Sequence, residues 1–326
     1  MIQRILLIRT DRMGDLLMTL PAVHGIRKGL PGAEITLLAQ EGLEPLLEDH
    51  PDVDRTLTWN PAEGKGWKAI LRSAARLRSG RFDAAVVFNP TREFHLACFL
   101  AGIPIRVGYK RKMGMLLTAS IPDTKGQRKR HEADYNLELA ELLGIKTGEP
   151  VLRLPEREKT ARQAQDLLQS HGLLQGGGPI ALHPWTSNPA KSWPLDSFWR
   201  LSAQLQQLGR PVVVIGGTEA LPEMESALST APPSLRNLVG KIPLGLLPAF
   251  IRRCALLVSN DSGPTHVAAA VGTPLVVVAP RSHADLLERW KPLGKRCLVL
   301  IDPDVAAAAE AARRQLNDVQ VGIPPV

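Results

Sequence analysis

The sequence has few cysteines, and their spacing indicates no metal or redox chemistry. The 326-residue chain contains three of them, Cys98, Cys254 and Cys297, which lie far apart. A zinc site or a redox pair is typically marked by a Cys-x-x-Cys spacing, which the sequence lacks. We therefore expect the thiols to be buried as apolar filler in a protein of a reducing compartment.

The sequence also lacks a long apolar run at its start. The first residues read MIQRILLIRTDRMGDLL, and charges interrupt the apolar stretches at Arg4, Arg9, Asp11 and Arg12. A signal-peptide core or a membrane span needs a longer uninterrupted stretch. We expect neither export nor membrane spanning, and a cytoplasmic location is predicted.

Aromatic residues are scarce around the main concentration of positive charge. The formal net charge of +8 favours anionic partners. Eight basic residues lie between positions 106 and 130, namely Arg106, Lys110, Arg111, Lys112, Lys125, Arg128, Lys129 and Arg130. Single-stranded nucleic acid binding needs aromatic stacking platforms, so no nucleic-acid partner is expected. The cluster is either an ordinary solvated face or a surface for acceptor phosphates, acceptor carboxylates or the anionic inner membrane leaflet.

Short apolar segments alternate with helical patterns in the first half of the chain. The apolar segments are 4–8, 34–39, 83–88 and 105–109. Between them, 19–30 and 66–79 carry apolar residues at three- and four-residue spacing. Strand followed by helix, repeated, predicts an α/β domain with a parallel sheet.

The same alternation restarts after a charged helical stretch at 156–171 and the glycine-rich segment LLQGGGP at 173–179. The second set of apolar segments is 179–184, 211–217, 255–260, 274–280 and 297–301. We predict two Rossmann-like domains, at 1–160 and 175–303. A helix and tail at 304–326 either close the second domain or cross back to the first. No solenoid repeat or low-complexity tract is present.

Ligands of open parallel sheets bind beyond the carboxyl ends of the strands, so the strand-to-helix turns carry the candidate chemistry. The first turn places Asp11 and Asp15 on either side of Gly14, before an apolar helix. Asp15 is either the N-cap of that helix or a general base that takes a proton from an attacking hydroxyl.

The second turn, HPWTSNPAKSWP at 183–194, carries Thr186, Ser187 and Lys191. Two hydroxyl donors and a mobile ammonium on a short loop suit a diphosphate. An ordinary proline-rich loop with a solvated lysine is the alternative, because Ser, Asn and Pro are common turn residues.

The third turn, SNDSGPTHVAAAVGTP at 259–274, is the strongest signal in the chain. Asp261 can accept hydrogen bonds from sugar hydroxyls, and amides at Ser262, Gly263 and Thr265 can approach a phosphate at a helix N-terminus. His266 is either part of this site or a core histidine. The loop lacks G-x-G-x-x-G, so a nicotinamide cofactor is not indicated, and we expect no cofactor.

A fourth turn, GGTEALPE at 216–223, is weaker. Glu219 or Glu223 can hydrogen-bond a ribose, although helix capping explains them almost as well. Two Asp-x-Asp triplets, at 52–54 and 302–304, have the form of a metal-held diphosphate site. Both adjoin a proline and neither lies at the main turns, so we interpret them as turn residues and expect no essential metal.

Taken in order, these motifs resemble the ADP-heptose:lipopolysaccharide heptosyltransferases of glycosyltransferase family 9. The resemblance covers most of the chain and is carried by five segments: IRTDRMGDLLMTLPAVHGIRKGLPGAEITLL at 8–38, RVGY at 106–109, HEADYNLELAELLG at 131–144, PAKSWP at 189–194 and SNDSGPTHVAAAVGTPLVVVAP at 259–280. One departure follows at 280–283, where this chain has Pro-Arg-Ser-His and many members have a Gly-Pro-Thr/Ser-like turn.

The resemblance implies a GT-B fold, with two Rossmann-like domains facing across a cleft, and an inverting transfer without metal from ADP-heptose to an acidic glycolipid. By this resemblance Asp15 is the general base. Together with the turns and the basic cluster, the resemblance leads us to predict as donor-binding residues Thr186, Ser187, Lys191, Glu219, Asp261, Ser262, Gly263 and His266. The predicted acceptor-binding residues are Asp11, Arg12, His131, Arg128, Lys129 and Arg130.

Three other functions fit parts of the pattern. A GT-B transferase or epimerase that uses another nucleotide sugar has the same fold. A non-catalytic nucleotide-sugar-binding protein has the same two domains without a base such as Asp15. A nucleic-acid-binding protein is suggested by charge alone.

Overall fold

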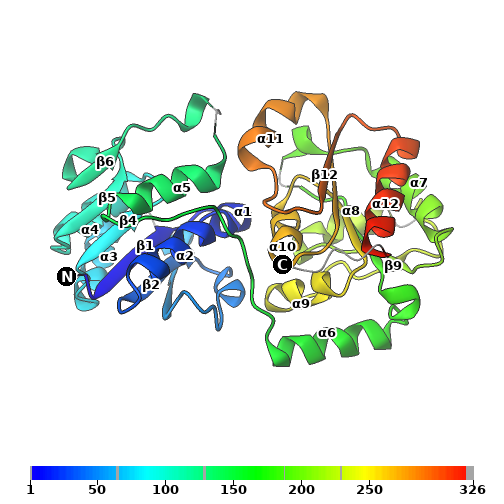
Figure 1. Cartoon of the computed structure of the whole chain (residues 1–326), viewed down its shortest axis with the longest axis horizontal. Coiled ribbons are helices and arrows are strands. Elements are labelled where there is room, and N and C mark those ends of the chain that lie inside the picture. The colour runs from blue at the N-terminus through cyan, green and yellow to red at the C-terminus, as the bar shows by residue number, and fades with distance from the viewer. Residues whose placement is uncertain (1, 64–65, 128–129, 187, 228–229, 321–326) are drawn as a thin grey trace. The chain divides into compact units, whose positions relative to one another are not determined.

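The computed structural model describes residues 2–63, 66–127, 130–186, 188–227 and 230–320 (Figure 1). The chain divides into two compact units, Met1–Leu152 and Arg153–Val326. Each unit contains a six-stranded sheet whose strand pairs are all parallel. The predicted class, two Rossmann-like α/β units, is confirmed.

The strand order of the first unit is β3-β2-β1-β4-β5-β6. Its strands are β1 (Arg4–Arg9), β2 (Glu34–Gln40), β3 (Arg55–Trp59), β4 (Ala84–Val87), β5 (Ile105–Tyr109) and β6 (Ala119–Ile121). Its helices are α1 (Met13–Leu17), α2 (Leu20–Gly29), α3 (Trp67–Ser79), α4 (Arg92–Leu100) and α5 (Glu132–Glu141), with short 3₁₀ turns η1 (Glu44–Leu46), η2 (Pro61–Glu63), η3 (Gly114–Leu116) and η4 (Lys125–Gln127).

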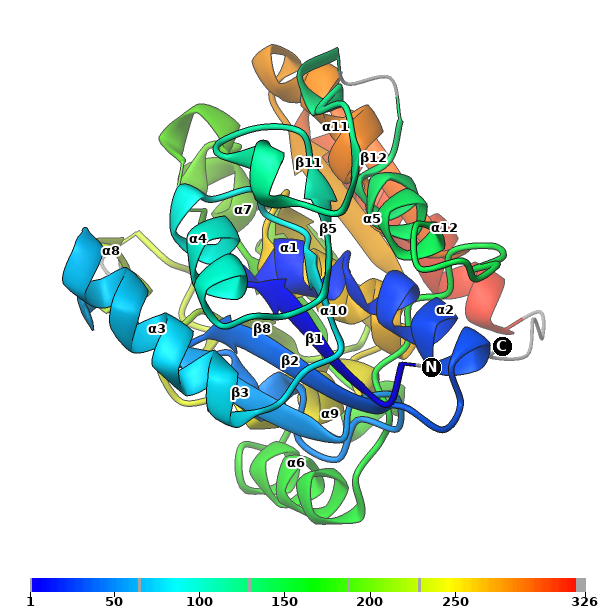
Figure 2. The same cartoon turned by 90° about the vertical axis from the view of Figure 1, so that its left-hand side faces the viewer.

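Helices cover both faces of this sheet. Leu6 and Ile8 of β1 belong to the core cluster that α3 and α4 complete with Leu77 and Phe94. Helices α2 and α5 pack together on the opposite face (Figure 2). Successive strand residues point to opposite faces, so a strand buried on both sides is apolar throughout. That is why residues 5–8, ILLI, form one continuous hydrophobic run.

The second unit has the strand order β12-β11-β10-β7-β8-β9. Its strands are β7 (Ile180–His183), β8 (Val212–Val214), β9 (Arg236–Asn237), β10 (Leu256–Asn260), β11 (Leu275–Ala279) and β12 (Cys297–Ile301). Its helices are α6 (Glu158–Ser170), α7 (Leu195–Gln206), α8 (Leu221–Ala227), α9 (Leu247–Arg252), α10 (Gly263–Val271), α11 (Ala284–Trp290) and α12 (Val305–Gln320), with 3₁₀ turns η5 (Gln175–Gly177), η6 (Pro189–Lys191), η7 (Thr218–Ala220), η8 (Leu244–Leu246) and η9 (Arg281–His283).

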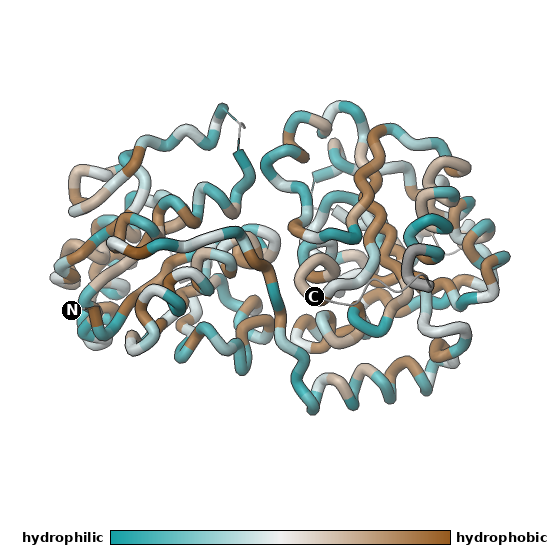
Figure 3. Tube along the Cα trace, in the orientation of Figure 1, coloured by the Kyte–Doolittle hydropathy of each residue, from teal (hydrophilic) through white to brown (hydrophobic). Residues whose placement is uncertain are grey.

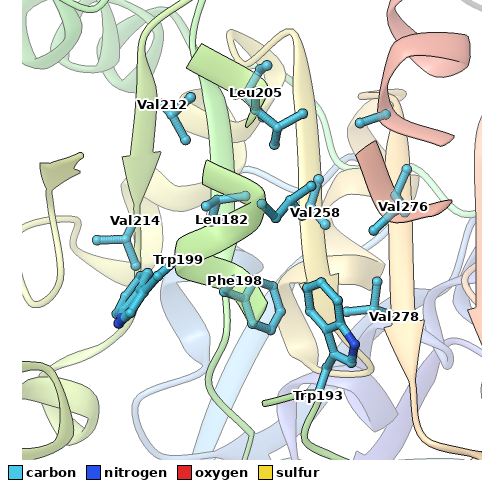
Figure 4. Close-up of a cluster of buried hydrophobic side chains, with 14 of the residues drawn as sticks. Leu182, Trp193, Phe198, Trp199, Leu205, Val212, Val214, Val258, Val276 and Val278 are labelled. Carbon is cyan, nitrogen blue, oxygen red and sulfur yellow. The ribbon is translucent and has the colours of Figure 1, made fainter. Parts of the chain in front are cut away.

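The main core of the second unit lies between its sheet and the α7–α12 pair. Alternate strand residues such as Leu182, Val258 and Val276 belong to one buried cluster with Phe198 and Trp199 of α7 (Figure 4). Helices α9 and α10 pack together away from this cluster, and α6 packs on α9. The hydrophobic colour in Figure 3 follows the strands, whereas the helices alternate between both colours.

The structure assigns two helices whose domain the sequence did not decide, the charged helix near the domain boundary and the C-terminal helix. The charged helix at 156–171, which the prediction left around the domain boundary, is α6 of the second unit. The C-terminal helix α12 packs on α7, and Ala308, Ala312 and Leu316 enter the core of the second unit.

Of the cysteines, Cys98 and Cys254 are buried and Cys297 is partly buried. Within the described residues, no helix combines the length and the apolar character that a membrane crossing requires.

Candidate functional site

In each sheet the strand order reverses beside the first strand of the unit, between β1 and β4 in one and between β7 and β10 in the other. Loops that leave the carboxyl ends of such strands diverge and leave room for ligands. Hydrogen bonds join the loops at both points, from Asn89 Nδ2 to Thr10 Oγ1 (3.1 Å) and from Asn260 Nδ2 to the Pro184 carbonyl. These two edges carry the polar clusters of the molecule.

The cluster of the first unit is organised by Arg9, the last residue of β1. Its side chain is only 2% exposed, and its guanidinium contacts three carboxylates. The distances are 2.7 Å from Nε to Asp11 Oδ1, 2.7 Å from Nη2 to Asp15 Oδ1 and 3.1 Å from Nη1 to Glu132 Oε1. A buried arginine is costly unless it is paired in this way, so the cluster fixes the loop after β1.

Residues from α5 and from η4 complete this cluster. Lys125 Nζ lies 2.6 Å from Glu132 Oε1 and 4.5 Å from the centre of the Tyr109 ring. Asn136 accepts from Arg9 Nη1 (3.4 Å) and donates to the Met18 carbonyl (2.9 Å). Within the segment HEADYN, Glu132 and Asn136 therefore fix the Arg9 guanidinium from α5.

The charges of the cluster shift its ionisation. Burial alone would lower the pKa of Arg9, but the carboxylates of Asp11, Glu132 and Asp15 raise it above its ordinary value. Burial raises the pKa of Asp11, against the opposing effect of Arg9. Arg9 is thus a permanent cation, and Asp11 accepts a proton more readily than an ordinary aspartate.

Asp15 is not the N-cap of its helix. The cap position of α1 is Arg12, and no side chain caps the helix there. Asp15 is the third residue of α1, and its side chain is 19% exposed. Its Oδ1 is held by Arg9, and among the described residues Oδ2 has no hydrogen-bond partner. A carboxylate with one oxygen fixed and the other available has the form of a general base.

The cluster of the second unit joins two predicted turns of the chain and a third loop, after β11, that was not predicted as part of the site. Lys191 follows β7, Asp261 follows β10 and His283 follows β11, and these three strands are neighbours in the sheet. Asp261 Oδ2 lies 3.1 Å from Lys191 Nζ and 2.7 Å from His283 Nε2. Asp261 and His283 are almost fully buried, whereas the Lys191 side chain is 22% exposed.

Asp261 is held as an anion. Burial would raise its pKa, but the hydrogen bond from His283 and the charges of Lys191 and His266 keep it below the ordinary value. The Lys191 ammonium is therefore anchored at one side by a buried carboxylate. Its position at the carboxyl edge of the sheet suits a positioned point charge that meets a phosphate.

Beside this cluster, His183 at the end of β7 bonds two serines. Its Nδ1 lies 3.3 Å from Ser259 Oγ and 3.1 Å from Ser262 Oγ. Burial lowers the pKa of His183 to about 4, so the ring is neutral at physiological pH. Ser262 is the cap residue of α10, and Gly263 is the first residue of that helix. The ring thus ties β7 to the loop that begins α10.

The remaining predicted donor residues differ in their surroundings. Thr186 Oγ1 accepts the Asn188 N–H (3.4 Å) within the loop before η6, and Ser187 lies outside the described residues. His266 is buried on α10, 4% exposed, and its charge acts on Asp261. Glu219 is exposed on η7, and no hydrogen bond of the described residues joins it to Asp261.

The predicted acceptor residues also lie in different surroundings. His131 caps α5, with Nδ1 accepting the Ala133 N–H (3.2 Å). Arg12 is exposed at the start of α1. Arg130 pairs with Glu138 (2.5 Å) and lies over the Tyr135 ring, whereas Arg128 and Lys129 lie outside the described residues.

A family model described as glycosyltransferase family 9 (heptosyltransferase) matches residues 70–317 of the chain. The chain belongs to glycosyltransferase family 9. Among curated relatives of this family 9 chain is lipopolysaccharide heptosyltransferase 2 of Escherichia coli (strain K12), which is 31% identical over 298 residues, covering 86% of this chain and 84% of the relative. The chain is accordingly a glycosyltransferase, and the resemblance noted in the sequence is confirmed.

Solved structures of similar proteins extend over nearly the whole family 9 chain. The glycosyl transferase family 9 structure from Veillonella parvula DSM 2008 has a TM-score of 0.85 at 24% identity, covering 97% of both chains. The structure titled E. coli heptosyltransferase WaaC with ADP-2-deoxy-2-fluoro heptose has a TM-score of 0.71 at 20% identity, covering 97% of this chain and 100% of that chain. These neighbours confirm the predicted GT-B fold.

Sequence reasoning missed several residues of the two clusters in this family 9 enzyme. Arg9 was read only as a charge that interrupts an apolar run, although a charge at the end of a buried strand is itself a signal. Glu132 lies in a quoted motif without an assigned role. His283 lies in the segment that departs from the family pattern, and His183 is the last residue of β7.

The Asp-x-Asp triplets are turn and helix-end residues, as predicted. Asp52 pairs with His24 (2.9 Å), and Asp54 accepts the Ile35 N–H (2.6 Å) and pairs with Arg27. Asp304 accepts the Ala307 N–H (2.7 Å) at the start of α12. In the part of the chain that the structure describes, no group of three or more His, Cys, Asp or Glu residues has a metal-binding arrangement.

Proposed function

We propose that this glycosyltransferase transfers heptose from ADP-heptose to the inner core of lipopolysaccharide, with inversion and without a metal ion. The observation that carries the proposal is the 31% identity, over most of both chains, to lipopolysaccharide heptosyltransferase 2. A structural neighbour whose title names an ADP-heptose analogue supports the choice of donor. The enzyme would work in the cytoplasm, at the inner face of the inner membrane.

The second unit is the proposed donor site. Lys191 meets the diphosphate, while Asp261, itself hydrogen-bonded by His283, holds the Lys191 ammonium. Amides at Ser262 and Gly263 begin α10, and a helix N-terminus favours an anion. Hydroxyls of Thr186 and Ser187 add donors, Glu219 meets the ribose, and His266 adds positive charge beside Asp261. Such fixed charges stabilise negative charge on a leaving diphosphate.

The first unit supplies the proposed base. An acceptor hydroxyl attacks the anomeric carbon, the bond from that carbon to the ADP oxygen breaks, and ADP leaves with the electron pair. Asp15 takes the hydroxyl proton through the oxygen that Arg9 leaves available. A single displacement of this kind inverts the anomeric configuration. Asp11, Arg12, His131, Arg128, Lys129 and Arg130 are the proposed contacts of the acidic acceptor.

Metal independence rests on the same charges. Lys191 and the start of α10 supply the positive potential that a divalent cation supplies in other transferases. The carboxylates of both Asp-x-Asp triplets are already engaged by neighbouring side chains or helix amides. Transfer is therefore expected to continue at an unchanged rate in the presence of EDTA.

The base assignment is tested by Asp15→Asn, with Asp11→Asn as the matched control. Both residues accept from Arg9 at 2.7 Å, so each substitution removes one carboxylate charge from the same guanidinium. We expect Asp15→Asn to fold and bind ADP but to lose turnover about a hundredfold or more, which is the usual contribution of a general base. Asp11→Asn, which removes a proposed acceptor contact and not the base, should lose much less turnover when the acceptor is saturating. Near-normal turnover of Asp15→Asn, or equal losses in the two variants, would reject the assignment.

The reaction itself is tested by incubating the enzyme with ADP-heptose and truncated lipopolysaccharide acceptors and measuring the mass of the product. Addition of one heptose supports the proposal. Use of a different nucleotide sugar from a panel would identify another GT-B transferase, and an isomerised donor an epimerase. Donor binding without any product would identify a non-catalytic binding protein.

A further inference from the structure

The exposed large hydrophobic residues of the first unit gather on one set of elements. In the described part of the chain, Trp67 (56% exposed), Leu71 (46%), Phe99 (48%) and Met115 (82%) are the exposed large hydrophobics of that unit. They belong to α3, α4 and η3. Helices α3 and α4 pack together and face the viewer in Figure 2, and η3 packs against α4.

The core does not require these side chains. Helix α3 buries Ile70, Ala74 and Leu77 against the sheet, which is the apolar stripe that its packing needs. Trp67 and Leu71 lie four residues apart, so they are neighbours on another flank of the helix. An amphipathic helix that also exposes a tryptophan and a leucine has a second apolar surface with no partner in this unit.

Helix α3 carries a marked excess of positive charge. Residues 67–79 include Lys68, Arg72, Arg76 and Arg78 and no acidic residue. All four are exposed, and no ion pair among the described residues involves Lys68, Arg76 or Arg78. Arg76 and Arg78 donate to backbone carbonyls, which leaves their charge unneutralised.

The loop before η3 repeats this composition. Lys110, Arg111 and Lys112 are exposed, although Arg111 pairs with Asp123 (2.8 Å), and the most exposed apolar side chain of the unit, Met115, follows them. The loop is tied to α4, because His95 Nδ1 lies 2.9 Å from the Lys112 carbonyl. Nearby, Arg106 lies over the exposed Phe99 ring at 5.5 Å.

We propose that the outer face of α3, α4 and the 110–116 segment docks onto an anionic lipid bilayer. Cations with interspersed tryptophan, phenylalanine, leucine and methionine match an interface where the apolar tips enter the acyl boundary and the charges meet lipid phosphates. An anionic bilayer fits this face because its negative charge complements the many cations, while its apolar interior accepts the exposed apolar side chains. The choice also rests on the proposed function, because a glycolipid acceptor lies in such a bilayer.

Docking is tested with the full chain and vesicles of phosphatidylcholine, with and without phosphatidylglycerol. Wild-type protein should sediment with the phosphatidylglycerol vesicles and not with phosphatidylcholine alone. Trp67→Ser/Leu71→Ser should partition into these vesicles at least about tenfold more weakly, because it removes two apolar side chains that would be buried in the bilayer. The matched control is Leu174→Ser/Val299→Ser, which changes the exposed apolar residues of the second unit and should bind as wild type.

A charge-reversal variant tests the second component of the face. Lys68→Glu/Lys110→Glu should weaken vesicle binding and reduce its dependence on salt. Thermal unfolding of every variant should match wild type, since all the altered side chains are exposed. Transfer to a delipidated oligosaccharide acceptor should be unchanged, so a failure of docking is distinguishable from a failure of the proposed reaction.

Two results would overturn the proposal. One is equal vesicle binding by the wild type and by Trp67→Ser/Leu71→Ser, or no binding by the wild type. The other is a wild-type dimer in light scattering that the double variant dissociates while neither protein binds vesicles, which would assign this face to a second copy of the chain.

Discussion

At the scale of single residues, the buried charges are explained by the two sites rather than by the core. Arg9 and Asp261 occupy the ends of central strands, where an apolar residue would pack without any desolvation cost. Each is instead surrounded by opposite charges, Arg9 by three carboxylates and Asp261 by Lys191 and His283. Buried ion pairs contribute little net stability, so their value here is in fixing Asp15 and Lys191.

Sequence reasoning at this scale predicts candidate residues in the turns, but not the partner side chains that fix those residues in place. Lys191 and Asp261 were predicted as one site, and their side chains meet although the residues are 70 positions apart. His283 and Glu132 were missed as partners because nothing local marks them: each contacts a residue far away in the sequence. Such pairing is decided by strand order, which one sequence does not specify.

His183 gives a testable pH dependence of stability. Its pKa is about 4 in the folded protein against an ordinary value of 6.5, because burial disfavours the charged ring. The unfolded chain therefore binds the additional proton between these values, and stability is lost as pH falls from 6.5 towards 4. The loss from this residue approaches about 3 kcal/mol at the lower limit.

The measurement is the free energy of unfolding from urea titrations across this pH range. His183→Gln keeps a polar side chain that can bond Ser259 or Ser262 but removes the titration. Its stability should depend on pH less steeply than that of the wild type below pH 6.5. An identical slope in the two proteins would show that His183 is not the neutral buried group described here.

At the scale of elements, periodicity predicts every central strand and one edge strand, β12, but misses the other three edge strands. The predicted apolar segments correspond to β1, β2, β4, β5, β7, β8, β10, β11 and β12. The strands that were missed, β3, β6 and β9, each lie at the edge of a sheet. Edge strands are covered less completely and need no continuous apolar run, and β3 and β9 contain exposed arginines.

The sequence did not decide whether the C-terminal helix closes the second domain or crosses back to the first; packing places α12 on the second unit. Its alanine-rich face allows close approach to α7, and Ala308 and Ala312 are fully buried there. Ala312→Leu should therefore cost about 1–3 kcal/mol by overpacking. Ala306→Leu, on the exposed side of the same helix, should leave the free energy of unfolding nearly unchanged. Equal effects in urea denaturation would contradict the packing of α12 on α7.

At the scale of the whole molecule, one topology is used twice. Each unit begins with the strand that becomes central, extends to one side, and then returns to the other side of that strand. The reversal brings two loops together at the carboxyl edge of each sheet. This general rule allowed the important turns to be selected from sequence, because it depends on connectivity and not on the identity of distant partners.

The proposed assignment of the donor site to the second unit predicts which segments ADP should protect. ADP should slow amide hydrogen exchange in segments 183–194, 260–271 and 281–285, which surround Lys191, Asp261 and His283. For amides that exchange through unfolding of the second unit, ADP at 100 times its Kd should slow exchange by about 100-fold, because a ligand stabilises only the state that binds it. Amides of β1 and β4 should change much less, since the proposed donor residues lie in the second unit.

A pair of lysine variants makes this prediction specific. Lys191→Met removes the charge that Asp261 anchors and should weaken ADP binding and with it the protection. Lys241→Met removes an exposed lysine of the same unit and should retain full protection. If ADP protected β1 and β4 without protecting 260–271, the nucleotide would bind to the first unit, and the assignment of donor and acceptor sites would have to be exchanged.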